Sequence, residues 1–253
     1  MSSTESTPTS ANETPCPGTR LGGAELGRAS VINPRAGKRR WGLRIVLALA
    51  AAAVLGALFV YDVPLMRWRY AVIGEEVQEP LANVLISFRD FTQIVTSIAI
   101  LIVVGTYDRR RWAIIGVFLL AQFFAKVGYD SGKHLLSRYR PGPAIARVAP
   151  LDELSNRQTW IGWRQGDGTI DTQSFPSGHS AAAFASALVL AWFYPRIAWL
   201  LWIMAIGCAV SRYLDAVHWP SDCWTGIFIG YLSARLALRI YLRFRPDPDS
   251  INQ

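Results

Sequence analysis

Histidine is scarce in this chain of 253 residues, which contains only three. Cysteine is equally scarce, and Cys16, Cys208 and Cys223 are isolated, with no CxxC or other paired spacing. This pattern argues against a zinc site and against a disulfide framework, so we expect three free thiols. Charged residues make up 17% of the chain, which is low for a soluble domain of this size.

Apolar residues take the place of the missing charges and make up 51% of the chain. They gather in six runs near the length of about 20 residues that a bilayer core requires. The predicted spans are roughly Leu43–Tyr61, Leu81–Gly105, Trp112–Tyr129, Gly178–Tyr194, Ile197–Leu214 and Cys223–Leu242. The first run has the position of a signal-peptide core, but no small-residue cleavage site follows it, so we interpret it as an uncleaved helix.

The two ends of the chain are polar. Residues 1–40 are rich in Ser, Thr, Pro and Gly without apolar periodicity, which predicts a disordered basic tail. Residues 41–245 are the predicted membrane domain, and residues 246–253 are a short polar tail. The predicted fold class is therefore all-α, an integral membrane bundle of six transmembrane helices.

Basic residues predict the orientation of this bundle, since the net charge of +8 is unevenly distributed. Arg and Lys cluster before the first span, after the second and fourth, and after the sixth. These four regions share one side if the helices alternate, and the positive-inside rule makes that side cytoplasmic. Both termini are therefore predicted to be cytoplasmic. The association of basic residues with apolar runs also argues against nucleic acid as a partner.

Three short segments fall in or beside the outward-facing loops and carry residues suited to phosphate. They contain Lys133 with Arg140, then Pro176-Ser177-Gly178-His179, then Ser211-Arg212 followed by His218 and Asp222. A phosphomonoester is about doubly charged. Arg binds two of its oxygens with a planar fork, and Lys adds a point charge.

The second segment is predicted to begin a helix. Ser177 would cap that helix, and the free backbone N–H groups of its first turn would form an anion site. Gly178 would let a phosphate approach the backbone closely, with His179 beside it. An ordinary capped helix with an exposed imidazole is the alternative interpretation.

The third segment is predicted to begin the last helix. Pro220 suits its first turn, which leaves His218 on the loop ahead. Asp222 would reach back to one imidazole nitrogen and turn the other outward as a nucleophile. Alternatively, Asp222 caps its own helix and His218 only lies at the membrane interface.

In this order the segments resemble the three motifs of the type 2 phosphatidic acid phosphatase superfamily. Lys133 to Pro141 fits Lys, six residues, Arg-Pro, and Pro176 to His179 fits Pro-Ser-Gly-His. Ser211 to Asp222 fits Ser-Arg, five residues, His, three residues, Asp. The ordered set is much more specific than any one motif, and the resemblance covers roughly residues 112–242.

The resemblance implies a mechanism. His218 would attack phosphorus and form a phosphohistidine, Asp222 would orient it, and His179 would protonate the leaving alkoxide and then activate water. The phosphate would be held, without a metal or other cofactor, by Lys133, Arg140, Ser177, Gly178 and Arg212.

The expected activity is hydrolysis of a lipid phosphate or pyrophosphate at the outer face of a bacterial inner membrane. The resemblance implies phosphatidylglycerol phosphate, phosphatidic acid, undecaprenyl pyrophosphate or lipid A phosphate as the substrate, and the motifs do not choose among them. Two alternatives stay open: a lipid phosphotransferase that uses the same phosphohistidine, and a membrane protein that only binds or transports an anion.

Other polar residues lie near these segments. Arg89 and Asp90, inside the second predicted span, would form a structural ion pair or contribute to the substrate site. Lys126 shares a helix face with Lys133 and is expected to be structural, and His134 is expected to point away from the phosphate. The aromatic and basic stretch 142–175 is expected at the membrane interface, as a lid or head-group reader.

Overall fold

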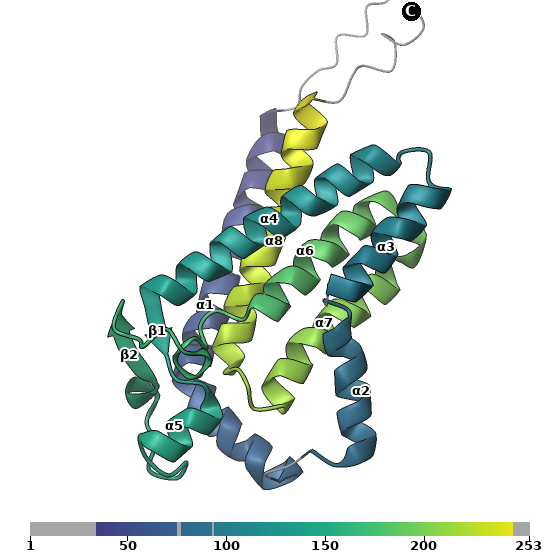
Figure 1. The fold of residues 1–253 in the computed structure, drawn as a ribbon. Coiled ribbons are helices and arrows are strands. Elements are labelled where there is room, and N and C mark those ends of the chain that lie inside the picture. Colours follow the sequence, from purple (N-terminus) through teal and green to yellow (C-terminus); the bar gives the residue numbers. More distant parts are fainter. Residues whose placement is uncertain (1–33, 75–76, 93, 245–253) are drawn as a thin grey trace, which may run out of the picture. The chain divides into compact units, whose positions relative to one another are not determined.

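The computed structural model describes residues 34–74, 77–92 and 94–244, and the chain divides into two compact units, Met1–Ile45 and Val46–Gln253. The described helices are α1 (Pro34–Ile73), α2 (Glu79–Asp90), α3 (Ile94–Tyr107), α4 (Arg111–Leu135), α5 (Pro141–Arg147), α6 (Gly178–Phe193), α7 (Ala198–Leu214) and α8 (Pro220–Phe244). Two short strands, β1 (Leu136–Arg138) and β2 (Trp160–Trp163), and the 3-10 helices η1 (Asn156–Thr159), η2 (Ile170–Thr172) and η3 (Pro195–Ile197) complete the fold (Figure 1).

Helix α1 extends beyond the predicted first span at both ends. It begins at Pro34, inside the predicted tail 1–40, and proline is well suited to a first helical turn. The rest of the predicted amino-terminal tail and the predicted carboxyl-terminal tail, residues 246–253, lie outside the described residues, so the domain boundaries stay a prediction.

The same helix continues past its predicted end at Tyr61, through Pro64. Proline lacks the N–H that would bond to the carbonyl of Val60, and this usually breaks a helix. The side-chain amide of Asn156 donates to that carbonyl instead, and its Oδ1 accepts from the N–H of Val63 at 2.9 Å. Asn156, far along the chain, thus supplies hydrogen-bond partners for the backbone groups of Val60 and Val63 near Pro64.

The second predicted span, Leu81–Gly105, is wrong as a single helix, since α2 ends at Asp90 and α3 begins at Ile94. Two threonine hydroxyls donate hydrogen bonds to backbone carbonyls at this break. Thr92 Oγ1 donates to Arg89 O at 3.0 Å, and Thr96 Oγ1 donates to Asp90 O at 2.6 Å. Such side-chain bonds compete with continued helix. Arg89 and Asp90 also form the ion pair that was one of the two predicted alternatives, at 3.1 Å.

The fold is mostly helical, as predicted, but it is not purely so, because β1 and β2 form a small antiparallel sheet. Its register pairs Leu136 with Trp163, Ser137 with Gly162 and Arg138 with Trp160. Aromatic and β-branched residues in β2 favour extended backbone. The stretch 142–175 is therefore built of α5, η1, β2 and η2 rather than being a simple loop.

Helix α6 lies at the centre of the bundle and contacts α4, α7 and α8 (Figure 1). Two glycines allow α8 to approach it. A Cβ atom at Gly226 would collide with the carbonyl oxygen of Ser177, and one at Gly230 would collide with that of Ala181. Small residues permit this backbone contact, which sets the start of α6 against the start of α8.

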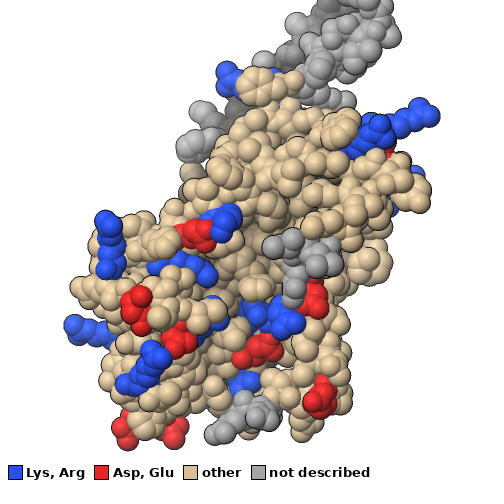
Figure 2. Space-filling view, in the orientation of Figure 1, with Lys and Arg blue, Asp and Glu red and all other residues tan. Residues whose placement is uncertain are grey.

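The surface of the helices suits a bilayer. Within the part of the chain that the structure describes, three segments are long and apolar enough to cross a membrane: Ala48–Ile73, Arg111–Leu135 and Pro195–Leu214. Exposed apolar side chains cover their outer faces, among them Leu119, Phe123, Ile203 and Ile206. Figure 2 shows that charged side chains gather over the end of the bundle carrying α5, β1 and β2, while most of the surface over α3 and α4 is uncharged. The count of six spans and the side of the membrane stay predictions.

Candidate active site

The three segments predicted to carry chemistry meet at one end of the bundle. Helices α4 and α7 end there and α6 and α8 begin there, which brings together Lys133, Arg140, Ser177, Gly178, His179, Arg212, His218 and Asp222. Backbone hydrogen bonds join the segments: Ser177 N–H donates to Asp222 O at 3.0 Å, and His218 N–H donates to Arg212 O at 3.2 Å. The gathering therefore follows from how the helix ends pack.

The start of α6 agrees with the prediction of a capped helix. Ser177 is fully buried, and its Oγ accepts hydrogen bonds from the backbone N–H and the hydroxyl of Ser180, at 3.4 and 3.1 Å. Gly178 lies against Tyr129, since a Cβ there would lie 3.1 Å from that ring and the ring would have to shift. His179 follows with an exposed side chain, so the predicted acid–base residue is open to water.

The start of α8 holds the second histidine differently. The helix begins at Pro220, as predicted, and His218 on the preceding turn is only 2% exposed. Its Nδ1 lies 3.8 Å from Asp222 Oδ2, which is too far for a hydrogen bond. Catalytic contacts are often this long without substrate. Because Nδ1 lies on the Asp222 side, Nε2 is the ring nitrogen available for the predicted attack.

Burial is the main electrostatic influence on His218. It lowers the pKa of the imidazole below its ordinary value of 6.5, and the charges of Arg140 and Lys133 act in the same direction. The Asp222 carboxylate opposes this effect and raises the pKa. The net result is a lowered pKa, so His218 is neutral at pH 7 and has a free lone pair, as a nucleophile requires.

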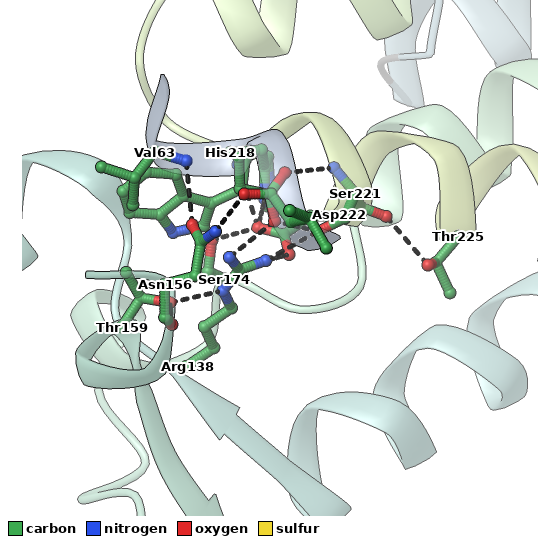
Figure 3. A network of polar contacts seen from close by, with 12 residues as sticks. Val63, Arg138, Asn156, Thr159, Ser174, His218, Ser221, Asp222 and Thr225 are labelled. Atoms are coloured by element: carbon green, nitrogen blue, oxygen red, sulfur yellow. Dashed lines mark hydrogen bonds and ion pairs between the residues drawn. The ribbon is translucent and has the colours of Figure 1, made fainter. Parts of the chain in front are cut away.

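Below His218, the Asp222 carboxylate is fully buried and held from three directions (Figure 3). Its Oδ2 accepts hydrogen bonds from Ser174 Oγ at 2.6 Å and from the backbone N–H of Trp219 at 3.0 Å. Its Oδ1 accepts from Arg138 Nη1 at 2.7 Å. The bond from Trp219 N–H also matches the alternative that Asp222 caps its own helix.

Sequence reasoning missed the rest of this network. Arg138 occupies an unspecified position within the first motif, and Ser174 lies two residues before the second. Asp62, in α1, accepts from Arg138 Nη2 at 2.7 Å and from Ser221 N–H at 2.9 Å. A lone acidic residue at the end of the first apolar run was the available signal, since a buried charge needs a partner.

The predicted phosphate ligands form a group of cations above this network. Among the residues that the structure describes, the buried side-chain nitrogens without a hydrogen-bond partner are Arg140 Nε, Arg212 Nε and His218 Nδ1. Buried donors are almost always bonded in proteins, so unpartnered ones call for an explanation. All three belong to this site. Arg212 does use its Nη2, which donates to the carboxylate of Asp215.

Two cavities adjoin at the end of α4, and Lys133 lines the first of them. The first, of about 540 Å³, is polar and is lined by Lys133, Arg164, Gln173 and Ser137 among others, with no carboxylate in its lining. The second, of about 600 Å³, is more apolar, with Phe123 and Val127 of α4 in its lining, although the ion pair of Lys126 and Asp130 also lines it. They share two lining residues, His134 and Leu135. A polar space and a more apolar one therefore adjoin at the end of α4.

Other predicted residues have structural partners. Lys126 forms an exposed ion pair with Asp130 at 2.7 Å, one helical turn away. Cys208 and Cys223 are buried free thiols, as predicted, and Cys16 lies outside the described residues. Arg67, in the part of α1 beyond the predicted first span, donates to loop carbonyls, including Leu151 O at 2.9 Å.

Comparison with known proteins finds a matching family model, a relative in sequence and two similar folds. The model of the PAP2 superfamily matches residues 110–246. The bacitracin transport permease protein BcrC of Bacillus licheniformis is 34% identical over 117 residues, which are 46% of this chain and 48% of that protein. The chain thus spans about half the length of this curated relative.

Two solved structures have a similar fold. LpxE of Aquifex aeolicus aligns with a TM-score of 0.51 at 22% identity, over 68% of this chain and 93% of that one. The first transmembrane PAP2 type phosphatidylglycerolphosphate phosphatase from Bacillus subtilis aligns with a TM-score of 0.50 at 18% identity, over 81% and 96%. At these identities the likeness shows the fold. Together with the three apolar spans, it identifies an integral membrane protein.

Proposed function

Because the chain belongs to the PAP2 superfamily, we propose that it is a phosphatase that hydrolyses a lipid phosphomonoester or pyrophosphate through a phosphohistidine. The observation that carries this proposal is the set of buried nitrogens without partners, at Arg140, Arg212 and His218. A phosphate group supplies acceptors for the two guanidinium nitrogens at once. It would also bring negative charge to a site where three cations lie close together.

In the first step, the neutral His218 uses Nε2 to attack phosphorus. A P–N bond forms while the P–O bond to the lipid alkoxide breaks, and His179 gives its proton to that oxygen. Asp222, on the Nδ1 side, stabilises the positive charge that develops on the imidazole. Lys133, Arg140, Arg212 and the amino end of α6 stabilise the charge on the phosphoryl oxygens.

In the second step, His179 is unprotonated and takes a proton from water. The resulting hydroxide attacks phosphorus, the P–N bond breaks, and inorganic phosphate leaves with His218 neutral again. The exposure of His179 supports this role, because the residue that activates water must be reached by water. The burial of His218 supports the role of a fixed nucleophile.

The two adjoining cavities support an amphiphilic substrate. The polar one beside Lys133 suits a head group, and the more apolar one along α4 suits the adjoining part of a chain. Phosphatidylglycerol phosphate, phosphatidic acid, undecaprenyl pyrophosphate and lipid A phosphate all fit this description. We place the site on the outer face of a bacterial inner membrane, with both termini cytoplasmic. Labelling of single cysteines introduced at the two ends of α4 tests that orientation.

Release of inorganic phosphate from these four lipids, in detergent with EDTA, tests the proposal. Wild type is expected to release phosphate and His218→Ala to release none, with a wild-type unfolding temperature. Arg110→Ala is the control, since Arg110 is exposed and pairs with Asp108 in the loop between α3 and α4. Full turnover by His218→Ala would overturn the mechanism.

The two alternatives give different products. A phosphotransferase would pass the phosphoryl group to a lipid hydroxyl, whereas a phosphatase working in ¹⁸O-labelled water puts one labelled oxygen into each phosphate released. A transport or binding protein, a role that the name of the Bacillus licheniformis relative suggests, would bind the lipid and release no phosphate. Phosphohistidine on His218, trapped by rapid acid-free quenching, separates catalysis from binding.

A further inference from the structure

Arg138 is an arginine with no exposed surface that bonds two carboxylates at once. Its Nη1 donates to Asp222 Oδ1 and its Nη2 donates to Asp62 Oδ2, both at 2.7 Å. Its guanidinium carbon lies 4.6 Å from the ring centroid of Trp160 and 5.1 Å from that of Trp219. Stacking rings and fixed bonds leave this side chain one orientation.

That orientation determines which oxygen of Asp222 faces the histidine. Arg138 takes Oδ1, so Oδ2 is left for Ser174 Oγ, Trp219 N–H and the Nδ1 atom of His218. Rotation of the carboxylate would break all of these contacts together. The planar fork of arginine is required, because lysine has a single ammonium and cannot span the two carboxylates in this geometry.

Asp62 anchors the other side of the fork. Its Oδ1 accepts from Ser221 N–H at 2.9 Å, and its Oδ2 accepts from Arg138 and from the Ser221 hydroxyl. With three donors on its oxygens, Asp62 has the contacts of a carboxylate. Ser221 is the residue next to Asp222, so Asp62 ties α1 directly to the first turn of α8.

We propose that Asp62 and Arg138 are positioning residues that hold the Asp222–His218 pair in its reactive arrangement through α1. This rests on the proposed function for the role of His218 and adds a second pair of residues behind it. One guanidinium between two carboxylates leaves a net negative charge beneath His218. That charge stabilises the positive charge that His218 gains when it becomes a phosphohistidine.

A second buried arginine provides the matched control. Arg69, also in α1, is 1% exposed and donates to two backbone carbonyls, Leu214 O at 2.8 Å and Gly74 O at 2.7 Å. It contacts no carboxylate of the network. A purely structural role for Arg138 predicts that Arg138→Gln and Arg69→Gln behave alike.

The test follows the imidazole of His218 by NMR, which needs no substrate and is simple in a chain with three histidines. The charged groups that face His218 are Asp222 of α8, Arg140 before α5 and Lys133 of α4, with His179 and Arg212 nearby. Arg138→Gln removes a positive charge, so the titration midpoint of His218 should rise by roughly half a pH unit or more. Asp62→Asn removes a negative charge, so it should fall.

Turnover of the same variants completes the test. Asp62→Asn and Arg138→Gln are expected to lower kcat roughly 10- to 100-fold, as loss of outer-shell partners does elsewhere, with KM within about two-fold of wild type. Arg69→Gln should lower the unfolding temperature yet keep the wild-type midpoint and kcat. If Arg138→Gln does not fold, Arg138→Lys and Asp62→Asn carry the test.

The outcomes are separable. Midpoints that do not move in Asp62→Asn and Arg138→Gln, or that move equally in Arg69→Gln, overturn the positioning role. If wild type releases no phosphate from any lipid but the midpoints shift as expected, the proposed function fails and the positioning of His218 stands.

Discussion

The site has two layers that differ in whether their buried polar groups have hydrogen-bond partners. In the lower layer, the acidic network of Asp62, Arg138, Ser174, Ser221 and Asp222, every carboxylate oxygen accepts at least one hydrogen bond. In the upper layer, the cation group of Lys133, Arg140 and Arg212, two buried guanidinium nitrogens have no partner. The network is complete without substrate, whereas the cation group is completed by an anion.

This difference separates the energetic roles of the layers. A buried polar group without a partner costs about 1–3 kcal/mol, so the cation group stores a penalty that a bound phosphate removes. The acidic network has no such penalty and gains nothing directly from substrate. Changes in the network should therefore affect the chemical step, and changes in the cation group should affect phosphate binding as well.

The largest expected effect breaks the network at its centre. Asp222→Asn keeps the size of the side chain but removes the charge that faces His218, and is expected to lower kcat by about 10³- to 10⁴-fold with little change in KM. The rate of phosphohistidine formation in a single turnover measures this step. Normal formation with slow hydrolysis would instead assign Asp222 to the second step.

Removal of one cation should give a different pattern. Arg140→Ala is expected to lower kcat/KM by about 10²- to 10³-fold and to raise KM, because a phosphate ligand is lost in both ground and transition states. Steady-state kinetics with the preferred lipid measure both constants. Arg110→Ala, which removes an exposed arginine at the other end of α4, should leave them unchanged. A normal KM in Arg140→Ala would contradict the division of roles between the layers.

The two layers also differ in how far the sequence predicted them. All three members of the cation group were predicted, because they are local to ordered motifs with fixed spacing. The cap at Ser177 and the helix start at Pro220 were predicted for the same reason, since both depend on neighbouring residues. The roles of these residues stay predictions until the kinetics are measured.

The acidic network was not predicted, because its contacts join residues far apart in the chain. Asp62 and Ser221 are separated by 159 positions, and no local pattern indicates that pairing. The continuation of α1 through Pro64 depends in the same way on Asn156, 93 positions beyond Val63. Tertiary contacts of this kind also explain the error at the second span, where side-chain bonds of two threonines divide an apolar run into α2 and α3.

The pH dependence of the reaction links the layers through His218. Burial lowers the pKa of His218, so its titration midpoint lies below pH 6.5. The acid limb of kcat/KM should therefore also lie below that value. Arg140→Ala removes a cation that contributes to the lowering, so the limb should move to higher pH. The pH profiles of kcat/KM for wild type and Arg140→Ala on one lipid measure this shift. The ionisation of the substrate is the same in both profiles and cancels in the comparison. Identical limbs would show that Arg140 does not act on His218.

The smallest expected effect concerns the one member of the cation group that already has a carboxylate partner. Arg212 donates to Asp215, the residue that follows α7, and this carboxylate competes with a phosphate for the same guanidinium. Asp215→Asn keeps an acceptor for Arg212 and removes the competing charge, so KM should fall about two- to five-fold at unchanged kcat. Burial raises the pKa of Asp215, although Arg212 opposes this, so the wild type should approach the variant as the pH falls and Asp215 gains a proton. Inhibition by inorganic phosphate at several pH values measures both trends. A higher KM in Asp215→Asn would mean that the carboxylate holds Arg212 in place, and the cation group would then depend on its own acidic support, as His218 does.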